Sequence, residues 1–476
     1  MAPDRDLVTS LVLADPGLPR QTPTESYWQH IPHPLAETQS ASLPAETDHA
    51  IIGSGITGLA VAKTLLEQHA TATVTVLEAR TLCSGATGRN GGQMAANAGE
   101  EYMHLAETHG AAIAGQIVSF TLRNLDQMHV LMEDYDAVET CEMQRVQKLR
   151  VFLTDDKFHA FQESIARLET DHPSLRGLYT ILDRDVVLQK YKIHGAAGGA
   201  LLPAATIWPY RLITKVFAAL IEKYPRRLTI ETQTPVESIQ HESNKSVFPY
   251  TLHTSRGLLR AGNVVHCTNG YSGHLLPNLR GRIHPFKGTM TVQDPKDTVP
   301  NQGTSLSWGF HYSPTYDSVT ERRGYGLYYL GQSVRTGYFY FGGEESRLED
   351  VVSADDSWVG EYSVGHLQSV LPGFFGQGSS WDVVSAWSGI MGFSSDGLPL
   401  VGRLPTTLTG REGNGEWIAA AFNGYGMANC LLSGEALARS ILGENKVDLP
   451  EAYGVGEKRL SQFLTASEAI KAWSKL

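Results

Sequence analysis

The sequence predicts an α/β protein that begins with alternating strands and helices and adds a mainly antiparallel sheet further along the chain. Three observations predict this class. Residues 50–77 hold two short apolar runs with a helical segment between them, the pattern of a parallel strand–helix–strand unit. From residue 228 the apolar period changes to two, as in half-buried strands. Between residues 308 and 341, 11 of 34 positions are aromatic, against 9% of the whole chain, and aromatic residues favour strands.

The composition is that of a globular protein with a negative charge. Of 476 residues, 42% are hydrophobic and 19% charged. The net charge of −11 argues against nucleic acid or an anionic membrane as a partner. No apolar run approaches the ~20 residues that span a bilayer. The four cysteines are scattered, without C-x-x-C or zinc spacing, so we expect reduced thiols and no metal site.

Residues 1–47 are rich in proline, serine and threonine and show no periodicity. This composition predicts an extended leader that lies on the surface or is partly loose. Tyr27, Trp28 and Ile31 are the side chains that would anchor it to the body of the protein.

A G-x-G-x-x-G motif follows the first apolar run. Gly53 permits a tight turn, Gly55 lets the backbone approach a pyrophosphate, and Gly58 lets the next helix pack close to the strand. The helix N-terminus then offers free N–H groups to the phosphates. Glu78 ends the second strand, 20 residues after Gly58, and can accept hydrogen bonds from a ribose. These features predict a Rossmann-like dinucleotide-binding unit and leave the choice between NAD and FAD open.

The rest of the chain gives a coarse order of elements. Helices are expected at 59–68, 98–135, 157–168, 186–191, 209–224, 357–371 and 424–442. Strands are expected at 50–52, 73–77, 150–153, 228–232, 236–241, 250–254, 264–268, 285–292, 381–387 and 417–422.

Five stretches carry a resemblance to a known family. They are the glycine motif with Leu-Glu-Ala-Arg at 77–80, Ser-Gly-Ala-Thr-Gly-Arg-Asn-Gly-Gly at 84–92, Val-Val-His-Cys-Thr-Asn-Gly-Tyr at 264–271, the blocks within 387–402, and Phe-Asn-Gly-Tyr-Gly-Met at 422–427. Over residues 26–443 the chain resembles the FAD-dependent amine and amino-acid oxidases grouped around D-amino-acid oxidase, glycine oxidase and sarcosine oxidase. It looks most similar to the branch that contains gamma-glutamylputrescine oxidase. The resemblance implies FAD rather than NAD.

The resemblance also implies a discontinuous architecture. A Rossmann-like FAD-binding domain would be built from 48–97, 205–285 and 385–445. An α+β substrate domain with a mainly antiparallel sheet, from 98–204 and 286–384, would be inserted into it. The leader 1–47 and a C-terminal segment 446–476 complete the chain.

The resemblance implies a set of FAD contacts. Arg89 would add a charge-assisted bond to a phosphate or the flavin, Val236 would offer its backbone to adenine, and Gly424–Met427 would place a helix N-terminus at the flavin C2=O. In some relatives a cysteine links to the flavin; the matching position is Gly389, so FAD is expected to be non-covalent. The implied contacts are Gly53, Gly55, Ile56, Thr57, Gly58, Glu78, Ala79, Arg80, Ser84, Thr87, Gly88, Arg89, Asn90, Gly91, Gly92, Gln93, Met94, Val236, Thr268, Asn269, Gly270, Gly389, Asp396, Gly424, Tyr425, Gly426 and Met427.

The implied reaction is hydride transfer from a carbon that bears nitrogen to flavin N5, which gives an imine, with oxygen reoxidising the flavin to yield hydrogen peroxide. An FAD-dependent dehydrogenase or desaturase with another electron acceptor, and a flavin-binding protein without turnover, stay open as alternatives. Sarcosine oxidases carry an active-site lysine on the strand that matches 329–341, where this chain has Arg335 and no lysine. No residue stands out as a base. The candidate pocket residues are Arg282, Tyr329, Arg335, Tyr338 and Trp387.

The chain finishes in Ser-Lys-Leu at 474–476. This tripeptide is the peroxisomal import signal, so we expect a peroxisomal protein with the import receptor as a partner. A peroxide-producing oxidase suits that compartment.

Overall fold

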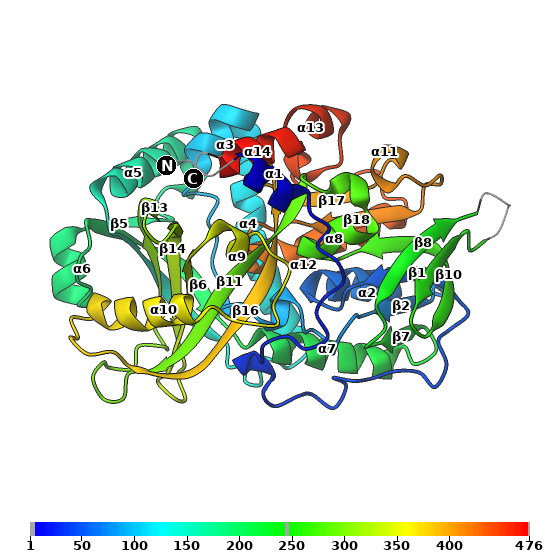
Figure 1. Cartoon of the computed structure of the whole chain (residues 1–476), viewed down its shortest axis with the longest axis horizontal. Coiled ribbons are helices and arrows are strands. Elements are labelled where there is room, and N and C mark those ends of the chain that lie inside the picture. Colours follow the sequence, from blue (N-terminus) through cyan, green and yellow to red (C-terminus); the bar gives the residue numbers. More distant parts are fainter. Residues whose placement is uncertain (1–4, 243–246, 475–476) are drawn as a thin grey trace.

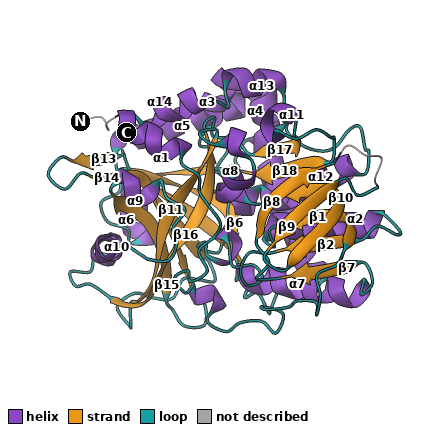
Figure 2. Ribbon diagram, turned by 45° about the vertical axis from the view of Figure 1, so that its right-hand side comes forward, coloured by secondary structure: helices purple, strands orange, loops and turns teal. Residues whose placement is uncertain are grey.

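The structure is a computed structural model that describes residues 5–242 and 247–474. Its strands form two sheets, which lie next to each other with helices around them (Figures 1 and 2). The predicted α/β class is confirmed. Within the described ranges, no helix has the length and apolar content that crossing a bilayer requires.

The first sheet is mainly parallel. Its strand order is β17-β18-β10-β1-β2-β7, and the hairpin of β8 and β9 extends it beside β10. β1, β2, β7, β10 and β18 run parallel, whereas β17 is antiparallel to β18. The strands are β1 (Glu46–Ile52), β2 (Val74–Leu77), β7 (Leu228–Glu231), β8 (Val236–His241), β9 (Tyr250–Thr254), β10 (Gly257–His266), β17 (Leu400–Arg403) and β18 (Glu416–Ala420).

Small residues bring helices close to this sheet. α2 (Ile56–Gln68) begins directly after the glycine turn, and a Cβ at Gly58 would overlap the carbonyl oxygen of Gly53. α12 (Cys430–Ile441) packs on α2, where a Cβ at Gly434 would lie 2.7 Å from the Cβ of Ala60. α7 (Pro209–Lys223) contacts α2 as well. α2 therefore lies between α12 and α7, and the three helices pack against the parallel strands β1, β2, β7 and β18.

The second sheet is mainly antiparallel and has the order β16-β11-β15-β14-β12-β4-β6-β3, with β13 beside β14 and β5 beside β6. Only β4 and β12 pair in parallel among its described strands. The strands are β3 (Gln93–Met94), β4 (Gln144–Phe152), β5 (Thr180–Asp183), β6 (Gly198–Thr206), β11 (Ile283–Asp294), β12 (Leu306–His311), β13 (Thr315–Asp317), β14 (Arg322–Gln332), β15 (Phe339–Ser346) and β16 (Asp382–Ser394).

Alternation gives the second sheet two different faces. Leu149, Val151, Phe310 and Tyr328 point to one face, where they form a core with residues of α6 (Arg184–Tyr191) and α10 (Glu361–Phe374). The residues between them point to the opposite, inner face. The remaining helices are α1 (Arg5–Leu13), α3 (Tyr102–His109), α4 (Ala111–Asp134), α5 (Asp155–Asp171), α8 (Ser272–Leu275), α9 (Leu348–Val351), α11 (Thr406–Thr409), α13 (Glu457–Gln462) and α14 (Ala466–Trp473).

The leader agrees with the prediction in part. Between α1 and β1, its residues form no helix or strand beyond the short 3₁₀ turn Tyr27–Gln29, and Ile31 is exposed rather than an anchor, but α1 was not expected. α1 packs against α14 near the two ends of the chain (Figure 1), and its Val8 and Val12, four residues apart, are buried. Further on, Trp28 is buried and donates from its indole nitrogen to the carbonyl of Asn90. A nine-residue helix followed at once by prolines offers too few turns for a periodicity to show.

The predicted elements are present, and their ends shift. The strands expected at 236–241 and 250–254 are β8 and β9. β10 starts seven residues before the predicted 264, and the helix expected from 424 begins as a short turn at 426 before α12. The divisions expected between 47 and 48, 204 and 205, 285 and 286, and 384 and 385 fall inside β1, β6, β11 and β16, respectively. The other part boundaries stay predictions.

Candidate functional site

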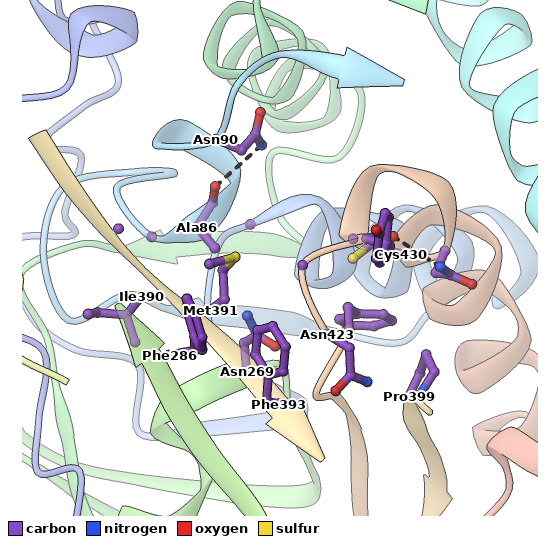
Figure 3. Close-up of a pocket in the computed structure, with 18 of the residues that line it drawn as sticks. Ala86, Asn90, Asn269, Phe286, Ile390, Met391, Phe393, Pro399, Asn423 and Cys430 are labelled. Carbon is purple, nitrogen blue, oxygen red and sulfur yellow. Dashed lines mark hydrogen bonds between the residues drawn. The ribbon is translucent and has the colours of Figure 1, made fainter. Parts of the chain in front are cut away.

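A cavity of about 760 Å³ is lined by both sheets (Figure 3). Its volume lies in the upper part of the range of roughly 300–1,000 Å³ for small-molecule sites. At one end are the turns that follow β1, β2 and β10, at the carboxyl ends of parallel strands, where ligands of open α/β sheets bind. At the other end is the inner face of the second sheet.

Most of the predicted FAD contacts line this cavity, although they are spread over almost 400 positions of the chain. The lining residues among them are Gly53, Gly55, Ile56, Thr57, Glu78, Ala79, Arg80, Thr87, Arg89, Asn90, Gly91, Gln93, Val236, Thr268, Asn269, Gly389, Gly424, Tyr425, Gly426 and Met427.

The other predicted contacts are not among the residues that line the cavity. The Ser84 hydroxyl accepts a hydrogen bond from Arg80, at 3.2 Å. Asp396 is bound by Arg459, with 2.7 Å between Oδ2 and Nε. These residues support the wall because their side chains are engaged by protein or, for the glycines, because a neighbour packs against them. The residues behind the wall are Gly58, Ser84, Gly88, Gly92, Met94, Gly270 and Asp396.

The glycine turn is shaped by its neighbours. Gly53 has a φ of +112°, and a Cβ there would lie 2.6 Å from the carbonyl oxygen of Cys267. A Cβ at Gly55 would lie 2.9 Å from Oγ1 of Thr87, which also accepts a hydrogen bond of 3.1 Å from the N–H of Ile56. The turn, the start of α2 and the loop 84–92 are thereby held together at the cavity.

Glu78 is fixed beside this turn. Its Oε2 accepts hydrogen bonds from the Ser54 hydroxyl at 2.6 Å and the Ser54 N–H at 3.1 Å, and its Oε1 accepts from the N–H of Arg80 at 3.1 Å. The carboxylate borders the cavity together with Val236. Its lone pairs exceed these three donors, so it keeps acceptor capacity for a ribose.

One buried carboxylate, that of Asp356, binds both arginines that line the cavity after β2, Arg80 and Arg89. Asp356 lies 2.8 Å from the Arg80 guanidinium and 3.7 Å from that of Arg89. Arg89 also donates to the carbonyl of Ser388 at 2.8 Å and to the Thr24 hydroxyl at 2.7 Å. Burial lowers the pKa of Arg89 to about 10, against the opposing effect of Asp356. Arg89 was expected to reach a phosphate or the flavin; instead, its guanidinium is bound by the protein.

A second charged cluster lies on the inner face of the second sheet. Lys148 of β4 donates to Oε1 of Gln93 at 2.9 Å, and burial lowers its pKa to about 8. Two residues on, Arg150 pairs with Glu100, whose other oxygen lies 2.8 Å from Nδ1 of His311. Burial also lowers the pKa of His311 well below its usual value. Lys148, Arg150 and His311 line the cavity. Neither cation of β4 was among the predicted site residues, although both alternate with Leu149 and Val151.

Among the five candidate pocket residues, Tyr329 alone lines the cavity within the described chain. Its ring lies against Gly91, where a Cβ would be 2.9 Å from the ring, and against Gly342. Trp387 is fully buried behind the wall and donates to the carbonyl of Arg89 at 2.8 Å.

The remaining three candidates are wrong. Arg282 precedes β11 and donates to the carbonyls of Leu460 and Leu464, each at 2.6 Å. Arg335 and Tyr338 lie in the turn between β14 and β15, away from the cavity. Arg335 is solvent-exposed and pairs with Glu142 at 3.5 Å. Both arginines were chosen because they lie in sequence next to strands expected to form the pocket. The carbonyls of the C-terminal segment decide where Arg282 points, and the turn between β14 and β15 decides where Arg335 points.

The cysteines and the acidic residues form no metal site among the described residues. All four cysteines are free, and Cys267 and Cys430 line the cavity. Burial raises the pKa of Cys430 to about 12, so its thiol stays protonated near neutral pH.

Comparisons with known proteins agree with this geometry. A family model described as "DAO: FAD dependent oxidoreductase" matches residues 48–440. Glycine oxidase from Geobacillus kaustophilus is 18% identical, with a TM-score of 0.64, over 87% of this chain and 99% of that chain. L-proline dehydrogenase from P. horikoshii is 18% identical, with a TM-score of 0.64, over 88% and 99%. Iminodiacetate oxidase from Chelativorans sp. BNC1 is 16% identical, with a TM-score of 0.63, over 85% and 98%. A search of curated proteins gave no match.

The cavity fits FAD. The glycines at 53 and 55 keep side chains out of the turn where a pyrophosphate would approach. Glu78 and Val236 border the same end, and Gly389 of β16 lines the cavity on the second sheet. A dinucleotide is long, and this cavity connects two sheets, so one molecule can reach both ends.

We expect Asp356→Ala to destabilise the protein strongly, because Arg80 and Arg89 would be left buried without a counter-charge. The free energy of unfolding should fall by about 3–5 kcal/mol, measured by denaturant unfolding. Asp355→Ala is the matched control: Asp355 is partly exposed and pairs only with Arg20, at 3.4 Å, among the described cations, so the loss should be about 1 kcal/mol or less. Equal losses would contradict a central role for Asp356.

We expect Lys148→Met to stabilise the protein at pH 7, because it removes a buried ammonium that has no acidic partner among its described contacts. The lysine pKa falls from 10.5 to about 8 on folding, so the gain should reach about 3 kcal/mol. The stabilisation should have its full size below pH 8 and decrease as the pH rises towards 10.5. Above that pH the wild-type lysine is neutral in both the folded and the unfolded state. Unfolding curves across this pH range measure it, with Lys190→Met on the exposed side of α6 as the control. If the difference in the free energy of unfolding between Lys148→Met and the wild type does not change with pH, Lys148 is not a buried lysine with a lowered pKa.

Proposed function

Because the chain belongs to the family of FAD-dependent oxidoreductases, we propose that it oxidises a C–N bond of an amine or amino acid and passes the electrons to oxygen. The observation that carries the proposal is the single cavity that joins the glycine turn of the first sheet to the inner face of the second. Two of the similar structures are named as oxidases of glycine and of iminodiacetate, which are both C–N donors.

In this proposal the ADP part of FAD lies against Gly53–Thr57, Glu78 and Val236. The isoalloxazine lies beside the loop 89–91 and β16, near Gly389. The start of α12, with Gly424–Met427 before it, directs N–H groups towards the ring, where they stabilise negative charge. FAD is held without a covalent bond, because position 389 has no side chain and the two lining thiols stay protonated.

The chain's own residues have a limited task in the reaction. FAD, when bound, supplies the hydride acceptor and the route for electrons to oxygen. The walls made by Tyr329, Met290 and Leu327 exclude water and orient the substrate. Burial disfavours charge, so an amine in this cavity is more readily neutral, with the lone pair that hydride loss requires. The C–H and N–H bonds of the donor break, a C=N bond forms, oxygen gains two electrons and two protons to give peroxide, and water then hydrolyses the imine.

A dehydrogenase that uses another electron acceptor is the second candidate. L-proline dehydrogenase matches the fold as well as glycine oxidase does, with the same TM-score of 0.64. The chain also lacks a lysine between Tyr329 and Phe341.

The test is anaerobic mixing of the purified protein with a panel of amines and amino acids, including glycine, proline, sarcosine and gamma-glutamylputrescine. We expect at least one compound to bleach the flavin absorbance, and admission of air to restore it with one peroxide per turnover. Bleaching that only an artificial acceptor reverses would support the dehydrogenase instead. No bleaching by any compound would contradict both.

We also propose that the protein is imported into peroxisomes through Ser-Lys-Leu at 474–476. Lys475 and Leu476 lie outside the described residues, so the support is the tripeptide itself and the suitability of this compartment for a peroxide producer. A fluorescent protein fused in front of the full chain should co-localise with a peroxisomal marker, and deletion of the three residues should abolish this. Unchanged localisation after the deletion would contradict the proposal.

A further inference from the structure

Part of the cavity lining comes from segments that lie outside the matched family region of 48–440. α14 contributes Ala469, Ala472 and Trp473 to the lining, and the segment after α1 contributes residues 17–19. α1 packs on α14, with Val8, Val12, Ala469 and Trp473 in one buried cluster. Segments near both ends of the described chain therefore contribute to the cavity lining.

Four rings form what we call the aromatic pocket: Phe286 of β11, Tyr325 of β14, Phe393 of β16 and Trp473 of α14. Phe286 stacks on Phe393 with 4.8 Å between ring centroids, and its centroid lies 5.5 Å from that of Tyr325 and 6.0 Å from that of Trp473. The indole N–H of Trp473 donates to Nε2 of His284 at 2.8 Å, which fixes the ring. All four rings line the cavity.

The aromatic pocket lies next to the proposed flavin position. Gly288 of β11 is paired with Gly389 of β16, and Phe286 is paired with Met391 two residues along on the same face. Two residues of a strand span about 6.6 Å. Phe286, Met391 and Phe393 are close together in Figure 3. If the reacting carbon of the substrate lies near Gly389, a substituent on that carbon can therefore reach the rings of the aromatic pocket.

The elements that form the aromatic pocket present no lysine or arginine to the cavity among the described lining residues. Burial lowers the pKa of His284 to about 4, so the imidazole is neutral near pH 7. Glu344 also lies on the lining, and its carboxylate accepts hydrogen bonds from Ser363 at 2.6 Å and Thr289 at 2.7 Å. The cations on the described lining are Arg80, Arg89, Lys148 and Arg150, and none belongs to the elements that form the pocket. A carboxylate placed among these rings would lose water and gain no counter-charge.

We propose that the aromatic pocket binds an uncharged apolar substituent of the amine substrate, best filled by an aromatic ring, and that Trp473 is a specificity-determining residue. The inference rests on the proposed function and names its substrate class: amines with an arylalkyl group rather than small or carboxylate-bearing ones. Ring–ring contacts favour an aryl group over an alkyl chain of similar size.

The experiment compares three primary amines with the same reacting CH₂–NH₂ group: 3-phenylpropylamine, butylamine and 4-aminobutyrate. The rate of anaerobic flavin reduction per unit substrate concentration should fall in that order for the wild type. Trp473→Ala should lower it at least about tenfold for 3-phenylpropylamine and less than about threefold for butylamine, whereas Trp473→Phe should keep most of the preference. Ile470→Ala is the matched control, because Ile470 packs on the same cluster from the same helix without lining the cavity. It should leave the preference unchanged.

A binding measurement separates this inference from the proposed function. The alcohol 3-phenylpropanol has no amine to oxidise, so its binding is followed by the shift of the flavin spectrum and by tryptophan fluorescence. It should bind at least about tenfold more tightly to the wild type than to Trp473→Ala, even if no amine is oxidised. Equal binding to both, a preference for 4-aminobutyrate, or the same selectivity change in Ile470→Ala would overturn the inference. Absence of flavin reduction with retained, Trp473-dependent binding would instead reject the proposed function alone.

Discussion

The cavity depends on the ion pairs made by Asp356. This carboxylate, from the segment between α9 and α10, is paired with Arg80 after β2 and Arg89 in the loop 84–92. The two guanidinium groups would repel each other in the interior, and a shared carboxylate lets both be buried. The leader joins the same group, because the N–H of Thr24 donates to the backbone carbonyl of Asp356 at 2.7 Å. Three segments distant in sequence, around Thr24, Arg80–Arg89 and Asp356, are thus fixed as one wall.

With this wall in place, each of the two sheets offers a surface that suits a different part of FAD. The parallel sheet ends in turns with exposed backbone N–H groups, which suit phosphate and ribose. The antiparallel sheet offers a wide inner face, whose alternate residues can be polar at Lys148 and Arg150 and aromatic at Phe286. FAD needs both kinds of surface, because its two halves differ in charge and shape. Trp473, which lies outside the family region, then joins Phe286, Tyr325 and Phe393 in the aromatic pocket, so residues inside and outside that region shape the selectivity together.

Much of the fold could be predicted from the sequence, because it depends on local patterns. The glycine motif, its flanking apolar runs and the change of period to two are set by residues close in sequence. Position 53 requires glycine for a reason that a motif encodes: its φ is positive and the Cys267 carbonyl lies close. Side-chain partners could not be predicted in this way. Arg89 is bound by Asp356 and Thr24, and Arg282 by two carbonyls of the C-terminal segment, and nothing near either arginine specifies these partners.

Lys148, Arg150 and Trp473 were not predicted as site residues for the same reason, because their positions depend on partners distant in sequence. Alternation along β4 shows that Lys148 and Arg150 share a face, but it does not show whether that face is solvent or a cavity; the pairing with β6 and β12 decides this. Trp473 belongs to an eight-residue helix near the end of the chain, and only its contact with His284 places it at the site.

The most direct measurement for the central claim is a crystal structure of the protein with its bound flavin. The account predicts one FAD per chain, with its pyrophosphate at Gly53–Thr57 and its isoalloxazine against Gly389 on the inner face of the second sheet. An isoalloxazine outside this cavity, or a protein that binds no flavin when saturated with FAD, would contradict it.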